Sequence, residues 1–281
     1  MRPMAEEKGR GLQFPYDARR AHDVCLRGLE ADASLARVGR RVALGVQQGM
    51  ILPAMDVIPE FGRSAREDDE AVLREVEALL GRFAVTAMIS RFEGFAQNLL
   101  LQRRFVEALL RQDKLSMSHT EFLQTFKRVQ NELRSTSLAR LPELIVQKPS
   151  SELAAKTVWL KGFYAIRKCL IHRQGIVQME DVGDGYELRV AWPGPRTYGA
   201  GVEIERVPHE VPVGHGVESR FETRETVWKV GEVIRFTSRE CQFAAFAISQ
   251  LATQLLVDFE VEMTPRTHQL DELSRAGSQS E

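Results

Sequence analysis

The side chains in this chain best suited to acid–base and phosphate chemistry are those of Arg167 and His172, which lie five positions apart. An imidazole exchanges protons near neutral pH, so a histidine can act as general base or general acid. A guanidinium keeps its charge and binds a phosphoryl group through two parallel hydrogen bonds. Together the two side chains could provide proton transfer and charge stabilisation at a phosphodiester.

The segment that carries these residues is locally basic. Residues 153–179 include neither aspartate nor glutamate, although the whole chain has 38 basic and 39 acidic side chains and a net charge of −1. Any nucleic-acid binding must therefore come from a local patch of this kind. At about 100° per residue, Lys161, Lys168 and His172 share one stripe of a helix, whereas Arg167 lies more than about 100° away.

A purely structural interpretation of this segment stays open. Cations in the last turns of a helix are stabilised by the helix dipole, by roughly 0.3–1 kcal/mol each, and Arg167 could pair with an acid elsewhere. The functional interpretation gains weight from context, because this is the only Arg-x(4–6)-His spacing in the chain and it closes a helix in an acid-free segment.

Five helices are predicted to form the scaffold of this segment. Hydrophobic residues recur with a period of about 3.6, and Ser118-x-x-Glu121 forms a capping box. Gly175 stands where a C-terminal glycine cap would follow the helix that carries Arg167. The predicted helices span 15–49, 70–110, 118–133, 151–173 and 238–259.

Between the last two helices the pattern changes to short strands. Gly183-Asp184-Gly185 is a turn signal, and alternation predicts strands at 186–192, 202–207 and 227–236. The fold class is therefore mostly α, an up-and-down helical bundle with a small β-strand insert before the last helix. Residues 1–65 are predicted to form an N-terminal helical extension. Residues 66–262 form the helical domain with its insert at about 184–236, and the polar residues 263–281 form a disordered tail.

Composition excludes several classes of protein. No apolar run approaches the roughly 20 residues of a membrane-spanning helix, and the charged N-terminus lacks the apolar core of a signal peptide. We therefore expect a cytoplasmic protein without a membrane span. The three cysteines lie far apart and the histidines show no ligand spacing, so no disulfide framework, metal site or cofactor is expected.

The chain resembles the HEPN domain superfamily. Residues 167–172, with the sequence Arg-Lys-Cys-Leu-Ile-His, resemble the Arg-x(4–6)-His motif toward the end of a late helix in that family. Gly175-Ile176-Val177 follows the motif as in many bacterial members, and residues 90–95 look like their acidic-aromatic segment. A strand-containing insert before a last helix is also similar. The resemblance covers roughly residues 66–262.

This resemblance implies a metal-independent endoribonuclease, in which the ribose 2′-hydroxyl attacks the adjacent phosphate. His172 would be the acid–base residue, and Arg167 would stabilise phosphate charge. Lys168, Arg173 and Lys161 would contact substrate. Lys168 departs from the family's commoner asparagine, and its ammonium would favour a neutral His172.

Two chains are expected to build the site, because Arg167 and His172 do not face the same way on one helix. Family members pair two motifs across a cleft, which implies a homodimer. RNA and an antitoxin or other regulatory protein are the implied partners, since many bacterial members are toxins or defence effectors.

Other residues carry weaker predictions. Glu93 could orient a motif residue, although a solvent-facing helix acid is the simpler interpretation. Cys169 is expected to be a buried structural thiol, His215 a loop residue, and the tryptophans packing residues. Two other functions stay open: an inactive HEPN module that binds nucleotide or RNA or dimerises, and an unrelated helical interaction protein.

Overall fold

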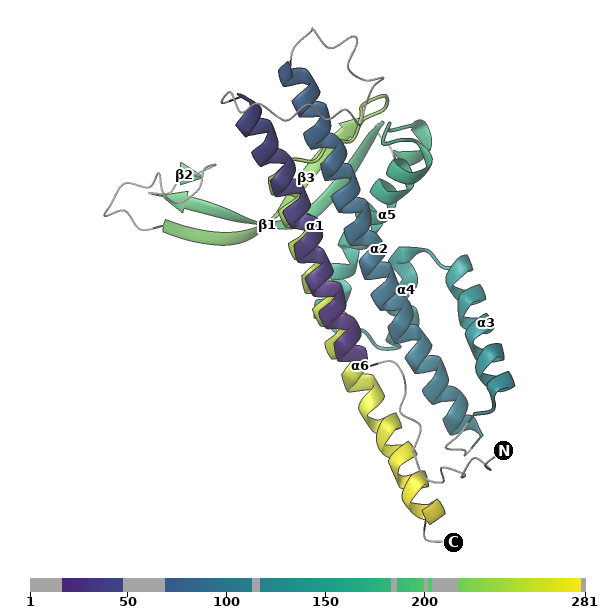
Figure 1. Ribbon diagram of the computed structural model, residues 1–281. Coiled ribbons are helices and arrows are strands. Elements are labelled where there is room, and N and C mark those ends of the chain that lie inside the picture. The colour runs from purple at the N-terminus through teal and green to yellow at the C-terminus, as the bar shows by residue number, and fades with distance from the viewer. Residues whose placement is uncertain are drawn as a thin grey trace, which may run out of the picture. The chain divides into compact units, whose positions relative to one another are not determined.

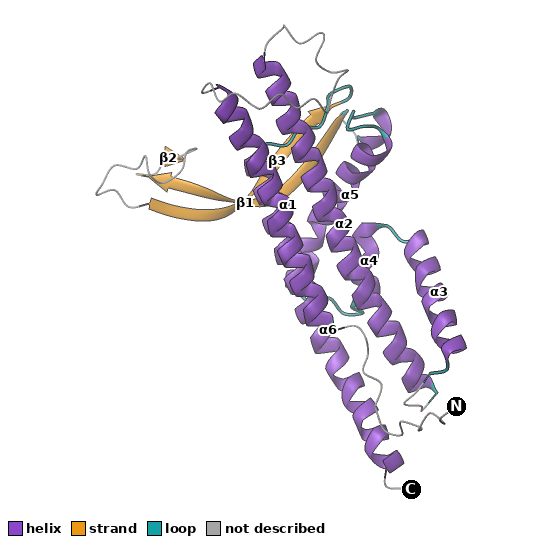
Figure 2. Cartoon of the chain, in the orientation of Figure 1, coloured by secondary structure: helices purple, strands orange, loops and turns teal. Residues whose placement is uncertain are grey.

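The computed structural model describes residues 17–47, 69–112, 117–182, 186–199, 202–203 and 217–278. It is mostly helical, with a small antiparallel sheet before the last helix (Figure 1; Figure 2), which confirms the predicted fold class at that level. The predicted turn at Gly183-Asp184-Gly185, the loop residue His215 and the strand residues 204–207 lie outside the described residues.

Four helices begin and end within three residues of their predicted bounds. The capping box that begins α3 is present, because Ser118 Oγ accepts from the Glu121 N–H at 3.3 Å and Glu121 Oε2 accepts from the Ser118 N–H at 2.7 Å. Two short 3₁₀ helices are η1 and η2, at Leu138–Arg140 and Met179–Asp181. The α-helices are α1 Ala18–Gln47, α2 Asp69–Arg111, α3 His119–Ser135, α4 Leu141–Ile145, α5 Ser151–His172 and α6 Ser238–Ser278.

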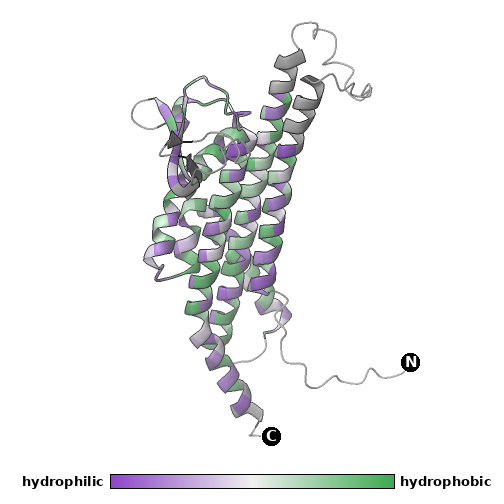
Figure 3. Ribbon diagram, turned by 90° about the vertical axis from the view of Figure 1, so that its left-hand side faces the viewer, coloured by the Kyte–Doolittle hydropathy of each residue, from purple (hydrophilic) through white to green (hydrophobic). Residues whose placement is uncertain are grey.

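Helix α6 differs from the prediction, because it continues to Ser278 through the stretch expected to be a disordered tail, with Pro265 inside it. Extending an existing helix is easier than nucleating one, so a polar continuation can remain helical. Pairs one turn apart support it, since Glu262 lies 3.0 Å from Arg266 and His268 lies 3.3 Å from Glu272. Figure 3 shows the hydrophilic character of this C-terminal part of α6.

One segment of α6 also bears on the membrane expectation. Among the described residues, Ser238–Leu273 is long and apolar enough to cross a membrane, with a mean hydropathy of 1.2 over its best window. Half of that window is buried inside the protein, and the core helices of soluble proteins can meet the same criteria of length and composition. Length and composition are therefore weak evidence for a span here.

The sheet has the order β2-β1-β3, with β1 at Glu187–Gly199, β2 at Val202–Glu203 and β3 at Val217–Lys229. The prediction of a strand at 227–236 is wrong in position, since β3 ends at Lys229 and a turn with Gly231 at φ +88° follows. The sequence of β3 is rich in charged residues and lacks a hydrophobic alternation, so its pattern resembled a polar loop.

The chain forms two compact units. The first contains Met1–Cys25, Glu93–Thr157 and Ala252–Glu281, and the second contains Leu26–Phe92 and Val158–Leu251. In the first unit, α3 lies beside the C-terminal part of α2 (Figure 1), and the rings of Phe105 and Phe122 stack with centroids 4.8 Å apart.

The second unit has an aromatic core that fixes α5 on the sheet. Trp192 of β1 is fully buried and lies 6.2 Å from Phe163 of α5 and 6.5 Å from Trp228 of β3, measured between ring centroids. The two tryptophans are thus packing residues, as predicted. A Cβ at Gly162 would lie 2.8 Å from Val190 Cγ1, so α5 approaches β1 at a position that has no room for a larger residue.

Candidate active site

Helix α5 separates a buried face from an exposed one. Leu160, Phe163, Ile166 and Cys169 are buried, whereas Lys161 and His172 are exposed and Lys168 is half-buried. The basic stripe expected from helix geometry therefore faces solvent. Val158 and Tyr164, also on this helix, are exposed as well, so the stripe is flanked by apolar surface.

The C-terminal end of α5 is anchored by backbone hydrogen bonds. Gln174 and Gly175 both adopt positive φ, at 55° and 81°, and the Gly175 N–H donates to the Cys169 carbonyl at 3.1 Å. Arg82 Nη1 donates to the Gln174 carbonyl at 3.1 Å, and the Ile234 N–H donates to the Gly175 carbonyl at 2.7 Å. The predicted glycine cap is therefore a two-residue left-handed turn tied to α2 and to the segment after β3.

His172 is the last residue of α5, directly before this anchored turn. Its side chain is exposed, and within the described residues no hydrogen bond or ion pair engages the imidazole. A fixed backbone with an unengaged imidazole in solvent leaves both ring nitrogens available to a substrate.

Arg167 is half-buried on the same helix, about 140° around the axis from His172. The two side chains therefore leave the helix in divergent directions. On one α5 the two side chains are therefore not directed at a common point, and the expectation that two chains build the site stays a prediction.

Arg173 has a different environment from the one that its predicted phosphate contact requires. Its guanidinium donates to Asp181 and lies 3.5 Å from Glu180, and the side chain of Asp181 is fully buried. The hydrogen bond to Asp181 raises the pKa of Arg173. The sequence segment without acids ends at residue 179, and η2 brings the next two residues back onto Arg173. The local positive charge is smaller than the sequence indicated for this reason.

Cys169 is fully buried, which confirms the prediction of a buried thiol. Burial, with a further contribution from the nearby Asp181 carboxylate, raises its pKa to about 11. The thiol thus stays protonated at neutral pH and is a poor nucleophile. Glu93, the weaker candidate, is half-buried on α2 in the first unit, whereas Arg167 and His172 belong to the second.

An apolar groove in the second unit was missed by sequence reasoning. It has a volume of about 490 Å³ and is lined by residues of α2 and α5. The residues from α5 are Leu170 and Ile171, which lie between Arg167 and His172 in the sequence. Phe83 is one of the hydrophobic residues that recur along α2, yet its side chain is 60% exposed. The lining residues are Leu79, Arg82, Phe83, Thr86, Leu170, Ile171 and Gln174.

Comparison with known proteins adds no family. No protein-family model, curated protein sequence or solved structure matches this chain. Among the residues that the structure describes, no three histidine, cysteine, aspartate or glutamate side chains cluster as metal ligands would. The class that fold and site define is a helical bundle with a small antiparallel sheet and an exposed histidine at the end of a basic helix.

Proposed function

We propose that this chain is a metal-independent endoribonuclease of the HEPN type. The observation that carries the proposal is the exposed, unengaged imidazole of His172 at the anchored end of a helix that also exposes Lys161 and half-exposes Lys168. Cationic side chains would hold the phosphodiester while the imidazole transfers a proton.

The reaction needs one proton removed and one delivered. One His172 imidazole takes the proton from the ribose 2′-hydroxyl, whose oxygen then bonds to the adjacent phosphorus. The bond from phosphorus to the 5′-oxygen breaks, and that oxygen receives a proton from a protonated imidazole. The products are a 2′,3′-cyclic phosphate and a 5′-hydroxyl. Arg167 stabilises the charge that develops on the phosphoryl oxygens.

Two copies of the chain supply this site. Arg167 and His172 diverge by about 140° on one helix, so convergence requires the motif of a second chain. The apolar groove next to the motif supports the same arrangement, since Phe83, Leu79 and Ile171 are 60%, 43% and 47% exposed. Exposed apolar surface of this kind marks interaction sites. A role as a toxin or defence effector, held in check by a regulatory protein, belongs to the same proposal.

The test is RNA cleavage by the purified protein in EDTA. His172→Ala and Arg167→Ala should both abolish cleavage while the circular dichroism spectrum stays unchanged. His119→Ala, which removes another exposed histidine at the start of α3, is the matched control and should cleave like the wild type. Cleavage that persists in both motif variants would refute the assignment.

A mixing experiment tests the two-chain site. If Arg167 and His172 come from different chains, unfolding and refolding the two inactive variants together should restore part of the activity. The alternative function is an inactive HEPN module that binds RNA or nucleotide or dimerises. The half-buried position of Arg167 favours this alternative, and a dimer that binds RNA without cleaving it would establish it.

A further inference from the structure

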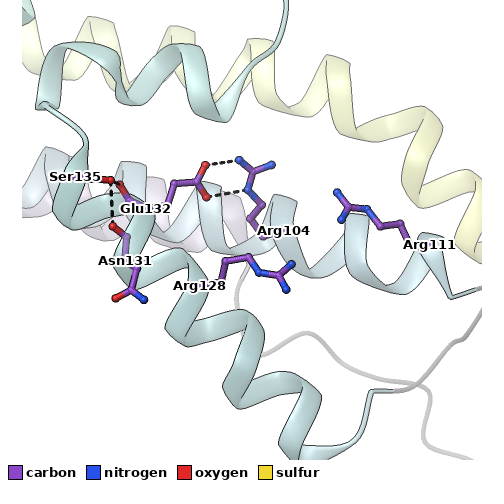
Figure 4. Close-up of a pocket in the computed structure, with 6 residues that line it drawn as sticks. All are labelled: Arg104, Arg111, Arg128, Asn131, Glu132 and Ser135. Carbon is purple, nitrogen blue, oxygen red and sulfur yellow. Dashed lines mark hydrogen bonds and ion pairs between the residues drawn. The ribbon is translucent and has the colours of Figure 1, made fainter.

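A second basic site lies in the first unit, far along the sequence from the motif on α5. It is a pocket of about 560 Å³ between α3 and the C-terminal part of α2 (Figure 4). Three arginines and one glutamate line it, so its lining has a formal charge of +2, three minus one. The lining residues are Arg104, Arg111, Arg128, Asn131, Glu132 and Ser135.

The negative charge in this pocket is already compensated. Arg104 donates to both oxygens of Glu132, at 3.1 Å and 2.5 Å, and to Glu107 at 2.8 Å. The hydrogen bond to Glu132 raises the pKa of Arg104. These hydrogen bonds fix Arg104 and Glu132 in one wall of the pocket. Because Glu132 is paired with Arg104, it does not neutralise the charges of Arg111 and Arg128.

Arg111 and Arg128 are both exposed, and their side chains extend from α2 and α3 into the same space (Figure 4). In the described part of the chain, no hydrogen bond or ion pair engages either guanidinium. Two guanidiniums that converge on a concave surface repel each other, and an anion between them relieves that repulsion. Guanidiniums bind phosphate oxygens through paired hydrogen bonds.

The two helices that carry these arginines are held against each other. Phe122 of α3 stacks on Phe105 of α2 at 4.8 Å, and the capping box fixes the first turn of α3. The arginines therefore project from a rigid pair of helices. Binding a ligand then costs less conformational entropy than it would if the two helices moved independently.

We propose that this pocket binds the phosphodiester backbone of single-stranded RNA. Arg111, Arg128, Asn131 and Ser135 are all exposed, so the pocket is open, whereas small-molecule sites bury most of their ligand. The described residues that line the pocket offer guanidinium, amide, carboxylate and hydroxyl groups and no aromatic ring, so the expected contacts are with the phosphate–sugar backbone.

This inference rests on the proposed function only for the identity of the polymer. The pocket would hold RNA in the first unit while the motif on α5 acts in the second. Its test must therefore measure binding independently of cleavage.

The experiment measures binding of a short fluorescent single-stranded RNA by anisotropy, at several salt concentrations, with the His172→Ala protein. Adding Arg111→Gln and Arg128→Gln should weaken binding by roughly tenfold, and the slope of log affinity against log salt should fall by about 1.4, or about 0.7 for each lost contact. The matched control is Lys127→Gln with Arg134→Gln, which removes two exposed charges from α3 outside the pocket. The control should change affinity less than about twofold.

An equal loss in both double variants would mean a general charge effect and would overturn the pocket, as would no loss in either or no binding at all. The two proposals can fail separately. If the wild type does not cleave RNA but RNA binding still depends on Arg111 and Arg128, the result supports this pocket and refutes the proposed ribonuclease activity. If the wild type cleaves RNA but binding does not depend on Arg111 and Arg128, the result refutes this pocket and leaves the proposed ribonuclease activity standing.

Discussion

Arg103 of α2 offers the largest stability change that can be worked out from the structure. Its side chain is only 2% exposed. Nε donates to Glu107 at 2.8 Å, Nη1 donates to the carbonyls of Leu144 at 3.2 Å and Ile145 at 2.8 Å, and Nη2 lies 3.3 Å from Glu262. One buried guanidinium thus connects α2 to α4 and α6 within the first unit.

Replacing Arg103 with methionine keeps most of the volume and removes every one of these contacts. Breaking a buried ion pair by removing one partner costs about 3–5 kcal/mol. The lower end applies here, because Glu107 keeps Arg104 at 2.8 Å and Glu262 keeps Arg266 at 3.0 Å. The expected loss is therefore about 3 kcal/mol, most of it from the two unpaired carbonyls and the partly uncompensated carboxylates.

Urea unfolding followed by circular dichroism measures this loss, provided that the dependence on urea keeps the same slope. The control is Arg189→Met on β1, whose side chain is 57% exposed and pairs with Glu187 and Glu225. Such an exposed pair contributes at most about 1 kcal/mol. A loss for Arg103→Met as small as that of the control would show that the buried network does not hold α4 in place.

Three further predictions concern single sites. Burial lowers the pKa of His22, so the unfolded chain binds more protons than the folded chain between that lowered pKa and about 6.5. Stability should fall as pH drops through this window, and urea midpoints at several pH values should show a smaller fall for His22→Gln. Burial raises the pKa of Cys169 to about 11 and that of Cys241 to about 12, so neither thiol should react with a thiol reagent at pH 8 until the protein is unfolded. Gly162→Ala should destabilise by about 1–3 kcal/mol in urea, because its Cβ meets Val190, and adding Val190→Ala should recover part of the loss.

The long helices could be predicted because their hydrophobic residues recur with the helical period and because local sequence signals mark their ends. The capping box at Ser118 and the apolar period of α2 needed no tertiary information. The C-terminal part of α6 and strand β3 could not be predicted in the same way. Both are polar, and their conformation depends on helix propagation in one case and on pairing with β1 in the other.

The residues of the candidate site could also be predicted only in part from the sequence. The spacing of Arg167 and His172 and the exposed side of α5 follow from helix geometry alone. The pairing of Arg173 with Asp181 does not, because it depends on the turn at Gln174 and Gly175 and on the position of η2. Nor does the pocket formed by Arg111 and Arg128, since their proximity depends on how α3 packs against α2.

The hydrogen bonds that anchor the C-terminal end of α5 bear on whether one chain could bring Arg167 and His172 together. A frayed helix end could turn His172 toward Arg167 when substrate binds, and one chain would then be enough. Here the carbonyls of Cys169, Gln174 and Gly175 are all engaged, so unwinding the last turn would break three hydrogen bonds. At about 1 kcal/mol each, that cost would reduce the productive population by roughly a hundredfold. We therefore propose that the chemistry of this motif uses a second chain, and a strictly monomeric protein with full cleavage activity would contradict that proposal.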